Sequence, residues 1–124
     1  MMGRLLCLCS VAIVVLAIAC APESPATDPV ARGRQVYRTL GCANCHEPSI
    51  SNLFRAAGPA LDEIGLVGGK RVPGMSAEDY IFQSITDPGA FVVPGYPDSM
   101  PRGLSNDLSP EDLAALVAYL ASLK

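Results

Sequence analysis

The feature that most constrains this chain is the segment Cys-Ala-Asn-Cys-His at residues 42–46, which places two of its five cysteines beside its only histidine. Two thiols and an imidazole at this spacing are compatible with three kinds of site. A dithiol redox site would need a strand before the motif and a helix after it, but a helical pattern precedes it and Glu47-Pro48 blocks an immediate helix. A structural zinc site would need four ligands, and only three cluster here.

Covalent haem attachment is the third possibility, and it uses every residue of the motif. Two thiols bond the porphyrin vinyl groups, and the adjacent imidazole reaches the iron. We therefore predict thioether bonds at Cys42 and Cys45 and an axial ligand at His46. An absorbance spectrum would distinguish this site from a non-haem metal site or a dithiol domain.

The N-terminus has the pattern of an export signal. Arg4 precedes an apolar run, Leu5 to Ala19, that contains only Ser10 as a polar residue. The run is shorter than the roughly 20 residues that span a bilayer, and Ala17-Ile18-Ala19 supplies a small-x-small cleavage site. Residues 1–19 are predicted to be a signal peptide, and the alternative is a retained membrane anchor.

Cys20 follows the cleavage site directly, and Leu-Ala-Ile-Ala-Cys resembles the lipobox of bacterial lipoproteins, although its leucine lies one place early. The next residues, APESPATDP, contain three prolines and no large apolar side chain, so residues 20–28 are predicted to form an anchor and an extended tether. This predicts an exported domain, lipid-anchored at Cys20 on the periplasmic or extracytoplasmic face of a membrane. Only Cys42 and Cys45 then remain as thiols of the folded domain, residues 29–124.

Three helices are predicted in that domain. The first begins with the N-cap pair Asp28-Pro29 and ends at Gly41. A middle helix follows Ser76 and ends at Asp87-Pro88-Gly89, and the last follows the cap Ser109-Pro110. Taken alone, these patterns fit many small all-α domains.

Together with the motif, they resemble the class I, mitochondrial-type monohaem cytochromes c, in their bacterial membrane-associated or lipoprotein form. Gly33 and Tyr37 match the first helix of that family, and Leu116 and Tyr119 match the last helix, which crosses it. The resemblance covers about residues 29 to 124. It implies an all-α class I cytochrome c fold, with three to four short helices wrapped around one covalently bound haem c.

Two loops carry the rest of the resemblance. Gly58-Pro59-Ala60-Leu61 resembles the Gly-Pro-x-Leu segment of the family, which implies that the Pro59 carbonyl accepts a hydrogen bond from His46. Residues 95–101, Gly-Tyr-Pro-Asp-Ser-Met-Pro, resemble the methionine-ligand segment of bacterial membrane-associated cytochrome domains, including those fused to oxidase subunits.

The sixth ligand is predicted to be Met100. Met75 competes with it, but Met75 directly precedes the N-cap of the middle helix, where a packing role is expected. Met100 leaves room for a helix between the two ligands, and its flanking prolines restrict the loop. Arg71 and Tyr96 are predicted to hold the propionates, because each flanks a segment expected to wrap the haem; Arg71 could equally be a solvated loop charge.

A histidine and a methionine together leave no open position for a substrate, so the predicted function is electron transfer between redox proteins rather than catalysis. Membrane respiratory complexes are the expected partners, and the domain could be an electron-transfer subunit of a larger oxidoreductase. A net charge of −3 gives no reason to expect nucleic acid, and no small-molecule substrate is expected. The alternative is a haem enzyme subunit or gas sensor with a displaceable sixth ligand.

Overall fold

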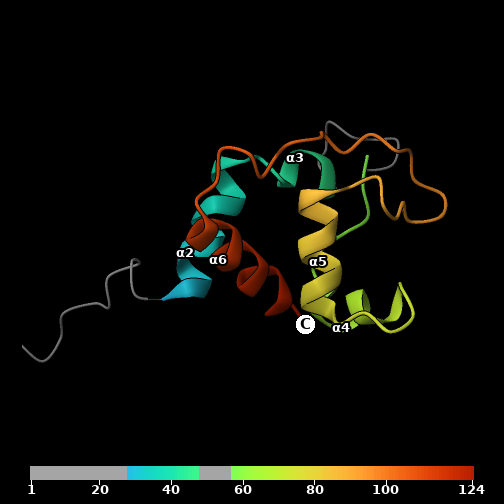
Figure 1. The fold of residues 1–124 in the computed structure, drawn as a ribbon, viewed down its shortest axis with the longest axis horizontal. Helices are drawn as coiled ribbons and strands as arrows, with labels where there is room; N and C mark the ends of the chain where they lie inside the picture. The colour runs from blue at the N-terminus through green and yellow to red at the C-terminus, as the bar shows by residue number, and fades with distance from the viewer. Residues whose placement is uncertain (1–27, 48–56) are drawn as a thin grey trace, which may run out of the picture.

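The computed structural model describes residues 28–47 and 57–124, and within them it is helical and contains no strand (Figure 1). The all-α prediction is therefore confirmed. Two one-turn helices and a 3₁₀ turn add to the three helices that the sequence predicted. The elements in chain order are α2 (Pro29–Thr39), α3 (Ala43–His46), α4 (Ile64–Val67), η1 (Gly68–Lys70), α5 (Ala77–Thr86) and α6 (Pro110–Ala121).

The predicted signal peptide, Cys20 and the tether as far as residue 27 lie outside the described residues. Their export, anchoring and tethering roles stay predictions. Within the part of the chain that the structure describes, no helix combines the length and the apolar character needed to cross a membrane.

Side chains cap the three long helices at the positions that the sequence indicated. The Asp28 carboxylate accepts from the backbone N–H of Val30 at 2.9 Å. The hydroxyls of Ser76 and Ser109 accept from backbone N–H groups three residues on, at 3.0 and 3.1 Å. Each cap satisfies a donor that the first turn of a helix leaves unpaired, and this fixes where α2, α5 and α6 begin.

The crossing of α2 and α6 is the most extensive contact between helices in the described part of the chain, and the two helices overlap in Figure 1. It depends on Gly33, because a Cβ there would overlap the carbonyl oxygen of Ala115 and lie 2.7 Å from Cβ of Tyr119. Tyr37 and Tyr119 flank the crossing, with ring centroids 5.5 Å apart at 62°. This is the edge-to-face geometry that aromatic pairs prefer.

The remaining elements close the core from the other side. α5 packs against α6 and η1, and the backbone N–H of Gly65 in α4 donates to Leu123 just beyond α6, at 3.0 Å. The segment between α5 and α6, residues 87–109, holds no helix and is called the α5–α6 loop below; in Figure 1 it runs in orange from the end of α5 across to α6. The buried core cluster consists of Tyr37, Ile64, Tyr80, Ile81, Ile85, Leu116 and Leu120.

Candidate haem-binding site

A cavity of about 330 Å³ lies between α3, α5, α6 and the α5–α6 loop. Its size falls in the range of roughly 300–1,000 Å³ that is typical of cofactor sites. Among the described residues that line it, Asp98 is the only aspartate, glutamate, lysine or arginine. The apolar lining residues are Leu40, Leu61, Ile64, Ile81, Ile85, Phe91, Val92, Val93, Leu104, Leu116 and Leu120.

The two cysteines of the motif lie at one wall of this cavity, on and just before α3. Gly41, with φ of +69°, turns the chain between α2 and α3, and Cys42 follows directly. Both thiols are free; Cys42 is half-buried and Cys45 is exposed. Burial raises the pKa of the Cys42 thiol above its usual value, because the thiolate is poorly solvated there. The described residues contain no cluster of three or more histidine, cysteine or acidic side chains arranged to hold a metal ion.

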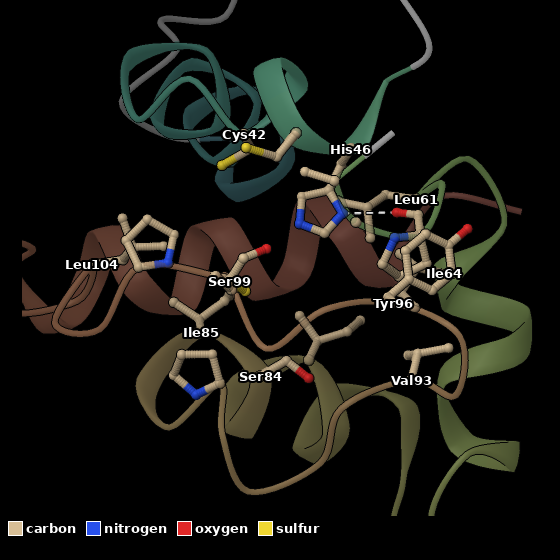
Figure 2. A pocket seen from close by; sticks show the side chains of 18 of the residues that line it. Cys42, His46, Leu61, Ile64, Ser84, Ile85, Val93, Tyr96, Ser99 and Leu104 are labelled. Atoms are coloured by element: carbon tan, nitrogen blue, oxygen red, sulfur yellow. Dashed lines mark hydrogen bonds between the residues drawn. The ribbon is translucent and has the colours of Figure 1, made fainter. Parts of the chain in front are cut away.

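His46 ends α3, and its ring is fixed by a backbone oxygen. Nδ1 lies 2.7 Å from the carbonyl oxygen of Pro59, the dashed contact in Figure 2, where the ring points into the cavity. A carbonyl only accepts, so Nδ1 carries the proton in this contact and Nε2 keeps its lone pair. An imidazole in this tautomer can offer Nε2 to a metal.

Gly58 lies against the ring of His46, and the sequence analysis gave it no role. A Cβ at this position would lie 2.7 Å from Cε1 and 2.9 Å from Nδ1 of His46, so glycine lets the ring lie flat against the backbone. The N–H of Gly58 also donates to the carbonyl of Cys45 at 3.0 Å, which ties the loop to α3. The sequence did contain a signal for this residue, because Gly58 directly precedes Pro59 in the segment that resembles the family.

A second link, which was not predicted from the sequence, holds the end of α3. The Tyr37 hydroxyl on α2 donates to the carboxylate of Glu47, the residue after His46, at 3.0 Å. Burial, together with the bond to Glu47, raises the pKa of the Tyr37 hydroxyl well above its ordinary value. The tyrosine therefore remains a neutral donor at physiological pH, and α2 stays joined to the end of the motif.

The two candidate methionines lie in different places. Met100 lines the cavity, as do the adjacent Ser99 and Pro101. Met75 is not among the lining residues; it packs against the core cluster at the start of α5. Of the two predicted propionate partners, Tyr96 lines the cavity and is labelled in Figure 2.

Arg71 is not a lining residue. Its guanidinium carbon lies 5.7 Å from the ring centroid of Tyr80, which does line the cavity. Its Nη1 is buried and has no hydrogen-bond partner among the described residues. A buried cationic donor without a partner is costly, and a carboxylate would satisfy it.

These observations fit haem. The cavity is apolar and has two thiols and an oriented imidazole at one wall, a thioether at another, and an unsatisfied arginine donor near its edge. Polar lining residues that the sequence analysis did not identify are Asn44, Ser84, Asp98 and Ser99.

Comparison with known proteins agrees with this geometry. Residues 30–124 match the family model described as cytochrome c. The chain is also 32% identical over 106 residues to a protein of Alkalihalophilus pseudofirmus named cytochrome c oxidase subunit 2, covering 82% of this chain and 28% of that protein. The chain thus spans less than a third of that relative's length. It belongs to the cytochrome c family and carries covalently bound haem c.

Proposed function

We propose that this cytochrome c is an exported, membrane-tethered carrier that passes single electrons between redox proteins, with His46 and Met100 as its axial ligands and Cys42 and Cys45 as its thioether positions. Haem iron held by a histidine and a methionine exchanges one electron and offers no open position to a substrate. The family supports electron transfer. The ligands, the tether and the partners are the parts that we propose.

The observation that carries the proposal is the contact between His46 Nδ1 and the Pro59 carbonyl at 2.7 Å. It selects the tautomer that can ligate through Nε2 and holds the ring toward the cavity, so ligation would require no rearrangement of this side chain. Met100 lines the same cavity on the α5–α6 loop, and Met75 does not, which favours Met100 as the second ligand. A thioether also suits haem iron better than an oxygen ligand.

The other lining residues support a carrier by excluding water from the cavity. Side chains of α5 and α6, such as Ile85 and Leu116, are almost fully buried against it. Low local polarity disfavours a charged ligand such as hydroxide at the iron. Tyr96 and Arg71 would donate to the propionates, and the unpaired Nη1 of Arg71 supports that role.

The partner is proposed from the relative's name and from the N-terminus. The similar protein of A. pseudofirmus is named as an oxidase subunit, so we propose that this carrier serves a membrane respiratory complex. A lipid on Cys20 would add roughly 0.8 kcal/mol of membrane affinity per buried methylene, and several chains would hold the domain at the extracytoplasmic surface. Cys20→Ser should release the protein from the membrane fraction; a wild-type protein that is fully soluble after export would contradict the anchor.

Carbon monoxide tests the ligand assignment. Met100→Ala should abolish the weak sulfur-to-iron absorption band of the oxidised protein, lower the reduction potential and let the reduced protein bind carbon monoxide. Met75→Leu is the matched control and should change none of these. If the wild-type reduced protein binds carbon monoxide readily, the alternative of a haem enzyme subunit or gas sensor with a displaceable ligand is favoured. The reverse pattern between the two variants would make Met75 the ligand.

A further inference from the structure

Arg102 links the Met100 segment to the turn that follows α5. Its Nη2 donates to Asp98 Oδ2 at 2.8 Å, so the ion pair brackets Met100 in the sequence. The same guanidinium lies on the backbone of Gly89, in the turn that follows α5. A Cβ at Gly89 would lie 2.5 Å from Nη1, 2.6 Å from Nη2 and 2.8 Å from Cζ of Arg102.

The backbone conformation does not explain the glycine at position 89. Among the described glycines, those with left-handed φ are Gly41, Gly74, Gly95 and Gly103, and Gly89 is not one of them. An alanine could therefore adopt the backbone at position 89, but its Cβ would occupy the space that the guanidinium fills. The guanidinium of Arg102 therefore fills the space that a side chain at Gly89 would occupy.

Elsewhere the α5–α6 loop is held by the ring of Phe91, whose centroid lies 6.0 Å from that of Tyr80 on α5, and by local turns. Its backbone hydrogen bonds include turns such as Tyr96 N–H to Val93 and Ser99 N–H to Pro97, at 3.1 and 3.0 Å. Such turns fix the local path of the chain but do not attach it to a neighbouring helix. Arg102 adds a contact between the Met100 end of the loop and the turn at its start, which directly follows α5.

We propose that Arg102 is a positioning residue that holds the Met100 segment against the turn that follows α5 and so opposes the displacement of Met100 by external ligands. The proposal rests on ligation by Met100, as proposed above. Arg102 is not among the cavity-lining residues and its side chain is 55% exposed, so it acts on Met100 through the loop and not by contact with the cofactor. An exposed ion pair contributes little, so the expected effect is modest.

The affinity of the oxidised holoprotein for imidazole measures how readily Met100 is displaced, because imidazole must take the place of the methionine. Arg102→Ala removes both the ion pair with Asp98 and the packing against Gly89, whereas Gly89→Ala removes only the packing. Asp98→Asn removes only the charge of the ion pair. We expect Arg102→Ala to bind imidazole about two- to fivefold more tightly than wild type, fivefold being about 1 kcal/mol, with Gly89→Ala and Asp98→Asn between the two. Lys70→Ala, which removes an exposed cation on η1, is the matched control and should leave the affinity unchanged.

Hydrogen exchange gives a second measurement that does not depend on ligand chemistry. Amides of residues 96–103 should exchange faster in Arg102→Ala and Gly89→Ala, while those of α2 should not change. Unchanged imidazole affinity and unchanged exchange in both variants would overturn the role of Arg102. Met100→Ala, measured in parallel, separates the two proposals. If it binds imidazole no more tightly than wild type, ligation by Met100 fails; if it binds more tightly while Arg102→Ala does not, only the positioning role fails.

Discussion

The two walls of the haem cavity are held in different ways. The wall with His46 is the end of a helical unit: α3 follows α2, α2 lies against α6 through Gly33, and the imidazole is bonded to the Pro59 carbonyl. The wall with Met100 belongs to the α5–α6 loop, which has no helix and is held by short turns, by the contact of Phe91 with Tyr80 and by the packing of Arg102 against Gly89. Changes on the first wall should therefore cost folding stability, and changes on the second should alter how readily Met100, the proposed ligand, is displaced.

The largest effect is expected where the helices cross. Gly33→Ala places a Cβ on the carbonyl of Ala115, and neither backbone can move without separating α2 from α6. Overpacking of this kind should lower the free energy of unfolding by about 2–3 kcal/mol, although alanine favours helix more than glycine by about 1 kcal/mol. Denaturant unfolding of the holoprotein measures the loss. Gln35→Ala, on the exposed face of α2, is the control and should be nearly neutral.

Gly58→Ala should have the next largest effect, and it should act on the ligand as well as on stability. The new Cβ would press on the His46 ring, which is the end of a side chain and can turn, so the cost should be about 1–2 kcal/mol. The turned ring would lose its bond to Pro59, and with it the orientation of Nε2. We expect a shifted reduction potential. Ala60→Ser, at an exposed position two residues on, should leave the potential unchanged; a potential that is also unchanged in Gly58→Ala would show that the ring is held by other contacts.

The difference between the walls also explains what the sequence could predict. The long helices were predictable because local signals fix them: the caps at Asp28, Ser76 and Ser109 are bonded as expected, and α5 ends at Thr86, directly before Asp87-Pro88. The one-turn helices α3 and α4 could not be predicted, because a segment that short cannot show a helical periodicity. The end of α3 is instead tied to α2 by the bond from Tyr37 to Glu47, and α4 is tied to the end of α6 by the bond from Gly65 to Leu123.

At the site, the residues with a characteristic chemistry could be recognised from the sequence. Residues that contribute by the space they leave, or by a contact with another element, could not. Gly58 and Gly89 act by leaving space beside His46 and Arg102, and the bond from Tyr37 to Glu47 joins different elements. None of these has a residue type that marks a function. Arg71 was named as a propionate partner, and its buried, unpaired Nη1 lies beside Tyr80 and not in the cavity wall, a position that only packing determines.

On the loop side, Pro101→Ala should give a smaller change. Proline restricts the unfolded chain, so its replacement should lower the free energy of unfolding by about 0.4–1 kcal/mol through added conformational entropy. Because Pro101 directly follows Met100, the same variant should also bind imidazole more tightly. Pro73→Ala, at an exposed loop position after η1, is the control for the entropy term alone. If both variants bind imidazole equally, Pro101 does not restrain Met100.

The smallest expected effect is a pH dependence on the helical side. Asp112 on α6 accepts from Arg32 Nε on α2 at 2.7 Å and from the Ser109 hydroxyl at 2.9 Å. The hydrogen bond from Arg32, followed by that from Ser109, lowers the pKa of Asp112 below its ordinary value of about 3.9. The folded state therefore binds this proton more weakly than the unfolded state.

With a lowered pKa in the folded state, the contribution of Asp112 is fully present above about pH 4, the value for the unfolded chain, and is lost as the pH falls through its folded pKa. Wild type should consequently lose stability more steeply than Asp112→Asn on acidification below about pH 4, and the difference between them should be constant at higher pH. Asp107→Asn removes one exposed charge without touching the pair and serves as the control. Both members of the ion pair, Arg32 and Asp112, are solvent-accessible, so added salt should shrink the difference. Parallel acid limbs for wild type and Asp112→Asn would mean that the α2–α6 crossing is held by Gly33 and its apolar neighbours, with no part for the ion pair.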